Sequence, residues 1–271
     1  MLELKTDFGK ILLLVVIFAM QIMQLSCQEF QTENENFYFV QITDTHIGKG
    51  TNLEITKSLI RQINKLPMEI KFVIHTGDIV NDGLIDTNTA LNALSAFIEL
   101  EVPIYFIPGN HDIYEAQFEQ QKKIYNKYFG DLVFVNEFAE IVFIGIYSDP
   151  LAYGFKADGY EPFVELKLAL KETKEKPVIL FHHIPTVGFF YNNEMHPGWN
   201  SENRNKWQDL LNSYNLVAVI AGHFHGSEQH WLGEIPIFVA ASATNRFGRQ
   251  PSFRIYEFKN GKLNFRTQYE E

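Results

Sequence analysis

The fold class is decided by one stretch, Ile104-Tyr105-Phe106-Ile107-Pro108-Gly109-Asn110-His111-Asp112. A short apolar strand here runs directly into polar residues, and open α/β sheets place their sites at such strand ends. Gly109 lets the backbone turn sharply, and Asn110 offers an amide oxygen that suits a hard or borderline metal ion. The adjacent His111 points elsewhere and is free to face a substrate. Asp112 is predicted to cap the following helix.

Four further short polar motifs follow apolar strands elsewhere in the chain. In two of them a pair of side chains at positions i and i+2 faces the same way in extended backbone, so both members can reach one ion. Gly77 allows a tight turn before Asp78, and Gly222 and Gly226 leave access to His223 and His225. These motifs are Asp44-Thr45-His46, Gly77-Asp78, His182-His183 and Gly222-His223-Phe224-His225-Gly226.

Strand and helix patterns alternate from residue 37 onward, which predicts one α/β domain with strands buried between helices. Asn260-Gly261 is predicted to join the last two strands. The strands are expected at 37–42, 71–75, 104–107, 141–146, 178–181, 216–220, 235–240, 253–258 and 263–267. The helices are expected at 53–66, 114–128, 162–173, 205–214 and 86–100, the last with Leu91, Leu94, Phe97 and Ile98 facing inward.

The composition limits the chemistry. Of the 271 residues 46% are hydrophobic, which is enough for a packed core. The formal net charge of -10 argues against nucleic-acid duplexes as partners. The single cysteine excludes an intrachain disulfide and a thiolate cluster, so any metal must be held by histidine, carboxylate and amide groups.

The first 27 residues are expected to form an export segment. Lys5 and Lys10 precede an apolar run from Ile11 to Met20, which is shorter than the ~20 residues of a membrane-spanning helix. A polar stretch at 28–36 is predicted to be a tether. The chain is therefore divided into an export segment at 1–27, a tether at 28–36 and one folded domain at 37–271.

Cys27 closes the export segment, in a Leu25-Ser26-Cys27 sequence that resembles a bacterial lipoprotein box. Gln24 stands where such a box prefers an aliphatic residue, but an ordinary cleavage site fits no better. We expect export to the periplasm or cell surface with a lipid anchor on Cys27. Without lipidation, cleavage would give a secreted protein. A lipidated residue anchors a chain to the membrane without making it span the bilayer.

The ordered series Asp-x-His, Gly-Asp, Gly-Asn-His-Asp, His-His and Gly-His-x-His resembles the calcineurin-like metallophosphoesterase superfamily, from Phe37 to the end of the chain. This resemblance implies a four-layer α/β/β/α sandwich with two mixed β-sheets between helices. It also implies two bound metal ions. One would be held by Asp44, His46, Asp78 and His225. The other would be held by the bridging Asp78 with Asn110, His182 and His223, and His183 would lie behind them.

The expected reaction follows from charge. Two divalent ions (Mn, Fe, Zn or Co) carry four positive charges, of which two aspartates and a bridging hydroxide cancel three. A positive site remains in an acidic chain, so a small phosphate ester can bind. We expect hydrolysis of a phosphomonoester or phosphodiester by the metal-bridging hydroxide. By resemblance, His111 would contact the phosphate and protonate the leaving group.

The aromatic stretch 187–200 contains residues that could contact the rest of the substrate. Phe189, Tyr191 and Trp199 could stack on a base or sugar, or the stretch could only cover the core. Arg246 could bind phosphate or be exposed to solvent. The alternative function is a non-catalytic scaffold with this fold. Such scaffold members are expected to lose metal ligands, whereas every expected ligand position is filled in this chain.

Overall fold

The computed structural model describes residues 36–188 and 198–271. Residues 36–271 form one compact unit. The predicted export segment, most of the tether, Cys27, Phe189 and Tyr191 lie outside the described residues. Within the described ranges, no helix is both long and apolar enough to cross a membrane.

The first sheet has five strands in the order β11-β10-β1-β2-β3. Strands β1, β2 and β3 are parallel, because β1 pairs with β2 and β2 pairs with β3 in that sense. Antiparallel pairing attaches β10 to β1 and β11 to β10, so the sheet is mixed. The strands are β1 (Phe37–Ile42), β2 (Ile70–Thr76), β3 (Ile104–Ile107), β10 (Ser252–Lys259) and β11 (Lys262–Tyr269).

The second sheet has six strands in the order β4-β5-β6-β7-β9-β8. Its four inner strands are parallel, and an antiparallel strand closes each edge. The strands are β4 (Val133–Phe138), β5 (Ile141–Ile146), β6 (Val178–Phe181), β7 (Leu216–Ala221), β8 (Glu228–Leu232) and β9 (Ile235–Val239).

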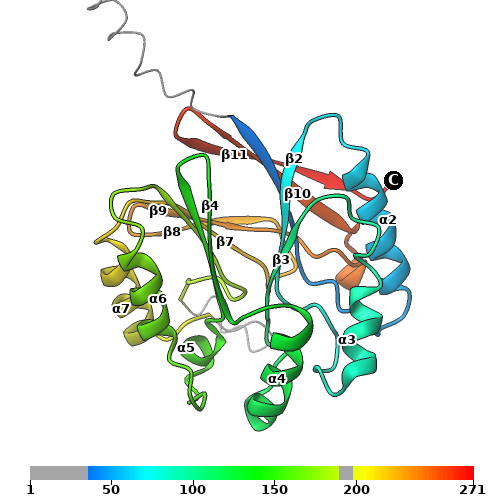
Figure 1. The fold of residues 1–271 in the computed structure, drawn as a ribbon, viewed down its shortest axis with the longest axis horizontal. Helices are drawn as coiled ribbons and strands as arrows, with labels where there is room; N and C mark the ends of the chain where they lie inside the picture. Colours follow the sequence, from blue (N-terminus) through cyan, green and yellow to red (C-terminus); the bar gives the residue numbers. More distant parts are fainter. Residues whose placement is uncertain (1–35, 189–197) are drawn as a thin grey trace, which may run out of the picture. The chain divides into compact units, whose positions relative to one another are not determined.

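Three apolar clusters hold four layers together (Figure 1). One lies between the sheets and is rich in phenylalanine, including Phe39, Phe143 and Phe181. The other two lie under the helices that cover the outer faces of the sheets. The first sheet is covered by α2 (Asn52–Asn64), α3 (Thr87–Leu94) and α4 (Phe118–Tyr128). The second is covered by α5 (Asp149–Tyr153), α6 (Pro162–Lys171) and α7 (Ser201–Leu211). The predicted α/β/β/α sandwich with two mixed sheets is confirmed.

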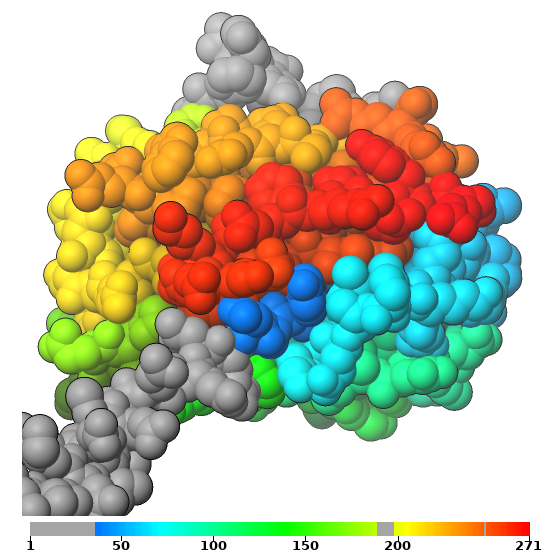
Figure 2. Space-filling view, turned by 90° about the horizontal axis from the view of Figure 1, so that it is seen from above, coloured from blue at the N-terminus to red at the C-terminus, as the bar shows by residue number. Residues whose placement is uncertain are grey.

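The closing hairpin of β10 and β11 forms as predicted. Asn260 and Gly261 both have positive φ, at 52° and 73°, which is what a tight two-residue hairpin turn requires. In Figure 2 the strand β11, in red, lies along the surface at the edge of its sheet.

Several details of the predicted elements are wrong, including the bounds of the helix expected at 205–214, which spans Ser201–Leu211. The helix expected at 86–100 ends at Leu94, and its buried face is formed by Ala90 and Ala93. Leu91 and Ile98 are instead 50% and 82% exposed. The edge strands β4 and β8 were not predicted, because neither has the continuous aliphatic run of an inner strand.

Candidate metal centre

All five polar motifs follow directly from strand ends, at β1, β2, β3, β6 and β7. Hydrogen bonds connect their loops. The Asp44 and His46 amides donate to the carbonyls of Gly77 and Asp78, both at 3.0 Å. The His223 amide donates to Asp44 Oδ2 at 3.1 Å, which brings the two sheets together at this point. Motifs far apart in sequence therefore form one site.

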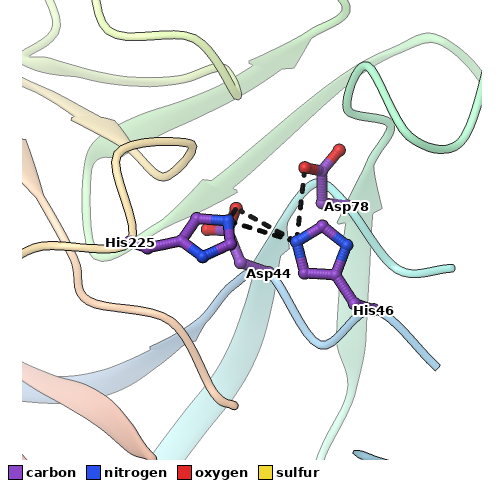
Figure 3. Close-up of side chains that lie close together, drawn as sticks. All are labelled: Asp44, His46, Asp78 and His225. Carbon is purple, nitrogen blue, oxygen red and sulfur yellow. Dashed lines mark hydrogen bonds and ion pairs between the residues drawn. The ribbon is translucent and has the colours of Figure 1, made fainter. Parts of the chain in front are cut away.

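The first cluster consists of Asp44, His46, Asp78 and His225, all buried, with one potential ligand atom from each within 4.8 Å of the others. His46 Nε2 lies 3.2 Å from His225 Nε2 and 3.7 Å from Asp78 Oδ2. His225 Nε2 lies 3.2 Å from Asp44 Oδ1. Figure 3 shows these side chains converging from three separate loops. The four atoms thus face a common point, as the ligands of one ion would.

The second cluster consists of Asp78, His183 and His223, within the same limit. His183 Nε2 lies 3.3 Å from Asp78 Oδ2 and 3.2 Å from Asn110 Oδ1. Asp78 Oδ1 is used differently, because it accepts a hydrogen bond from the His111 amide at 2.8 Å. Oδ2 therefore faces both clusters, which suits a carboxylate that bridges two ions.

The structure corrects the assignment of His182 to the second cluster. The His182 ring instead lies against Trp199 and Trp207, and its Nε2 is 2.9 Å from Thr186 Oγ1. Adjacent side chains on extended backbone point in opposite directions, so only one of the two histidines can face the site. That residue is His183.

Backbone conformation also distinguishes the site. Nine non-glycine residues in the described ranges have positive φ, a conformation that is uncommon for them. Five of the nine belong to the two clusters: Asp44, His46, Asp78, His223 and His225. Strained residues of this kind collect at functional sites, where the surrounding contacts hold them in place.

The electrostatics favour a bound cation. Burial alone would raise the pKa values of Asp44 and Asp78, but His225 beside the first and His183 beside the second lower both. Burial would lower the pKa of His183, yet the neighbouring Asp78 raises it well above its usual range. Two fully buried carboxylates at one place therefore attract positive charge, which metal ions can supply.

The donor set fits divalent ions of the Mn, Fe, Zn or Co type, because it combines carboxylate, amide and imidazole groups. Burial lowers the pKa of His46 to about 4, so its ring is neutral and able to act as a ligand. Asp44 Oδ1 is buried and makes no well-aligned hydrogen bond, although His225 Nε2 lies 3.2 Å away, and His46 Nδ1 is also buried without one. A metal ion bound to Asp44 Oδ1 would give that oxygen the partner it lacks.

His111 lies at the edge of the clusters and is partly exposed. Its ring contacts the His46 ring edge-on, with centroids 4.8 Å apart. His111 Nδ1 is 2.7 Å from the Asn81 carbonyl oxygen, which can only accept, so Nδ1 carries the donated proton. Nε2 is the remaining nitrogen and can exchange a proton with a ligand.

Asp112 does not cap a helix, because Gln117 occupies the N-cap of α4. Its buried carboxylate instead accepts three backbone hydrogen bonds, from Ile79 at 3.1 Å, Val80 at 2.9 Å and Gly109 at 2.8 Å. It therefore ties the Asp78 loop to the loop that carries Asn110 and His111. Sequence reasoning missed this role, since Ile79 and Val80 are about thirty positions before Asp112.

A buried relay holds the Asp44-Thr45-His46 loop. The Gly77 amide donates to His75 Nδ1 at 3.3 Å, so the proton of the neutral ring is on Nε2. Burial lowers the pKa of His75 to about 3, which keeps the ring neutral. Nε2 then donates to Thr45 Oγ1 at 2.9 Å, and this hydroxyl donates to the Ile79 carbonyl at 3.0 Å. Thr45 is thereby fixed between the two predicted ligands.

Gly109 has to be a glycine because neighbouring atoms lie where a side chain would begin. A Cβ at this position would collide with the Asp78 carboxylate and backbone nitrogen and with the His183 ring. We expect Gly109→Ala to lower the free energy of unfolding by about 1–3 kcal/mol, as overpacking does. Urea unfolding of the metal-free protein measures this. Gly188→Ala is the matched control, because a Cβ there meets no atom of the described residues within 4 Å. Equal stabilities of the two variants would contradict the close packing.

The predicted substrate-contacting residues have different outcomes. Phe189 and Tyr191 lie outside the described residues. Trp199 is 0% exposed, and its indole nitrogen donates to the Ile184 carbonyl at 3.1 Å, so the structure corrects its assignment to the substrate. Arg246 does reach the site, with Nη1 3.2 Å from His46 Nε2.

Comparisons with known proteins identify the family and the fold. A family model described as calcineurin-like phosphoesterase matches residues 37–227. A probable cyclic nucleotide phosphodiesterase of Colwellia psychrerythraea is 26% identical, over 73% of this chain and 75% of its own. A probable glycerophosphodiester phosphodiesterase GpdQ of Arcobacter nitrofigilis is 31% identical, over 76% and 78%. A dimetal phosphatase from Danio rerio matches 87% of this chain and 99% of its own, with a TM-score of 0.58 at 14% identity.

Proposed function

Because the chain belongs to the calcineurin-like phosphoesterase family, a family of hydrolases acting on phosphate esters, we propose that it hydrolyses phosphodiesters with the help of two divalent ions. The observation that carries this proposal is the pair of buried clusters that share Asp78. When bound, such ions supply positive charge to the phosphoryl oxygens and lower the pKa of bound water. The first cluster would hold one ion, and the second cluster with Asn110 would hold the other.

The residues of the chain would prepare the site for an anion. Asp44 and Asp78 bring two negative charges, fewer than the four positive charges of two divalent ions. The local charge would be positive although the whole chain has a net charge of -10. A phosphate ester would therefore be drawn to these loops and not to the rest of the surface.

His111 would serve as the acid for the departing alcohol. Its Nδ1 donates to the Asn81 carbonyl, so a protonated ring presents Nε2–H toward the site. The amide of the same residue donates to Asp78 Oδ1, which fixes the ring's backbone relative to the second cluster. Both contacts orient His111 before any substrate binds.

Diesters are proposed as the first substrate class on the strength of relatives. The two bacterial relatives described above, at 26% and 31% identity, are named as phosphodiesterases. The test is hydrolysis of bis-p-nitrophenyl phosphate by the purified protein, stripped of metal and reloaded with Mn, Zn, Fe or Co. Metal-dependent turnover would support the proposal. If no metal binds, the proposal is lost and a binding scaffold with this fold takes its place.

The acid role predicts a leaving-group effect. We expect His111→Gln to reduce kcat about 100-fold on a diester with an alkyl alcohol leaving group, because general acids contribute on this order. The loss should be several-fold smaller with p-nitrophenol, which leaves readily without a proton. His230→Gln, on the edge strand β8, is the control. Equal reductions of kcat for the two leaving groups would contradict the acid role of His111 and would indicate that it only contacts the phosphate.

A further inference from the structure

The face of the first sheet that packs against the second sheet becomes polar near the metal centre. On β1, Phe37 and Phe39 belong to the phenylalanine-rich cluster between the sheets, but the next residue with the same orientation is the buried Gln41. On β10, Tyr256 belongs to that cluster, and the buried Arg254 lies two residues before it on the same face. Burying such polar groups costs free energy unless hydrogen bonds satisfy them, so their partners matter.

The three polar side chains form one hydrogen-bonded chain whose direction is fixed, because a guanidinium can only donate. Arg254 Nη1 donates to the Tyr256 hydroxyl at 3.3 Å, and this hydroxyl donates to Gln41 Oε1 at 3.0 Å. Burial raises the pKa of Tyr256, so the hydroxyl keeps the proton that it donates. The Gln41 amide is thereby oriented, and its Nε2 donates to Thr76 Oγ1 and to the Ala221 carbonyl, both at 2.8 Å.

The two acceptors of Gln41 Nε2 are strand ends that lead into the metal centre. Thr76 is the last residue of β2, two positions before Asp78. Ala221 is the last residue of β7, two positions before His223. These strands belong to different sheets, so Gln41 joins the sheets at the place where the ligands from both of them meet.

Both ends of the hydrogen-bonded chain are also fixed to residues of the site. At one end, the Thr76 carbonyl accepts a hydrogen bond from His183 Nδ1 at 2.7 Å, and His183 Nε2 then faces Asp78. At the other end, Arg254 Nη2 donates to Ser227 Oγ at 2.7 Å. Ser227 lies just after the loop that carries the two histidines of β7, so this loop is held on both sides.

We propose that Gln41 is a positioning residue of the metal centre, which together with Tyr256 and Arg254 holds the histidines of the second sheet at the distance from Asp78 that two ions require. This inference rests on the proposed function. The bonds of Gln41 go to strand ends and not to ligand side chains, so it acts through the backbone that carries the ligands. Removing an outer partner of this kind typically weakens metal binding by about 10- to 100-fold.

The test uses Gln41→Leu, which keeps the size of the side chain and removes its three hydrogen bonds. Calorimetric titration of the metal-free protein with Mn²⁺ should give dissociation constants raised by about 10- to 100-fold. Tyr256→Phe removes one hydroxyl but leaves both Gln41 donors, so its loss should be less than about tenfold. The double variant should bind Mn²⁺ as Gln41→Leu does, within about twofold, because both changes act through the same amide.

Phe143→Leu is the control for a general loss of stability. Phe143 lies in the same cluster between the sheets, and shortening its side chain should lower the urea midpoint while leaving the Mn²⁺ affinity unchanged. Circular dichroism would show that each variant is folded under the conditions of the titration. If Gln41→Leu does not fold, Tyr256→Phe carries the test by itself.

The possible failures are distinguishable. Unchanged Mn²⁺ affinity in Gln41→Leu and Tyr256→Phe, or an equal loss of affinity in Phe143→Leu, would overturn the inference and leave the proposed function in place. Additive losses in the double variant would overturn the part that Tyr256 plays through Gln41. A wild-type protein that binds no divalent ion would overturn the proposed function, and the inference with it.

Discussion

Asp78→Asn is expected to reduce metal-dependent ester hydrolysis at least about 1,000-fold, since this carboxylate is the one shared by both clusters. Oδ2 lies 3.7 Å from His46 Nε2 and 3.3 Å from His183 Nε2, so it faces both proposed ions. An amide has nearly the same shape and removes the negative charge. Removing that charge should raise the activation free energy by several kcal/mol. Each step of about 1.4 kcal/mol lowers the rate tenfold, so a loss of about 1,000-fold follows. Steady-state kinetics and elemental analysis measure activity and bound metal together.

Asp82→Asn is the matched control for Asp78→Asn. Asp82 lies on the same loop and makes the same change in charge, but its side chain is exposed. It should keep both the metal content and the activity of the wild type. Circular dichroism would show that both variants are folded. Full metal content and near-normal turnover in Asp78→Asn would contradict the bridging role.

The sequence allowed the site to be located because each motif follows a strand. The carboxyl ends of β1, β2 and β3 meet at one edge of the first sheet, and those of β6 and β7 meet at one edge of the second. A polar residue just after a buried strand is therefore placed before any tertiary contact is known. The structure does place Asp44, His46, Asp78, His223 and His225 in the two adjoining clusters.

What the sequence could not decide is which neighbour a side chain meets. Asp112 looked like a helix cap, yet two of its three amide partners, Ile79 and Val80, belong to another motif's loop. Trp199 could have been a substrate contact or a cover for the core, and it packs against Trp207 with ring centroids 5.2 Å apart. Both outcomes depend on contacts between distant segments, which local pattern and spacing do not specify.

The pair His182-His183 is the sharpest case. Alternation along extended backbone shows that the two rings point to opposite sides. It does not show which side holds the clusters. That choice is made by the surroundings, because Trp199 and Trp207 fill the space around His182. His183 Nδ1, in contrast, is held by the Thr76 carbonyl at 2.7 Å, which leaves Nε2 directed at Asp78.

The two histidines should therefore respond differently to substitution. We expect His183→Ala to lose one bound ion and at least about 1,000-fold in kcat/KM, because the second cluster would keep only Asp78 and His223 with Asn110. His182→Ala should retain both ions. Its defect should appear as a fall of about 2–5 kcal/mol in the free energy of unfolding, since it leaves a cavity beside two buried tryptophans.

Metal content, kcat/KM and urea unfolding of both variants distinguish the two roles. His182→Gln keeps much of the side-chain volume and serves as a second variant if the alanine protein unfolds. Loss of an ion from His182→Ala with full retention in His183→Ala would restore the assignment made from the sequence. We expect the opposite result because the two histidines have different neighbours. A histidine whose Nε2 lies 3.3 Å from a buried carboxylate and 3.2 Å from an amide oxygen has polar partners that an ion can share. A histidine enclosed by indole rings has packing partners, and its removal costs stability.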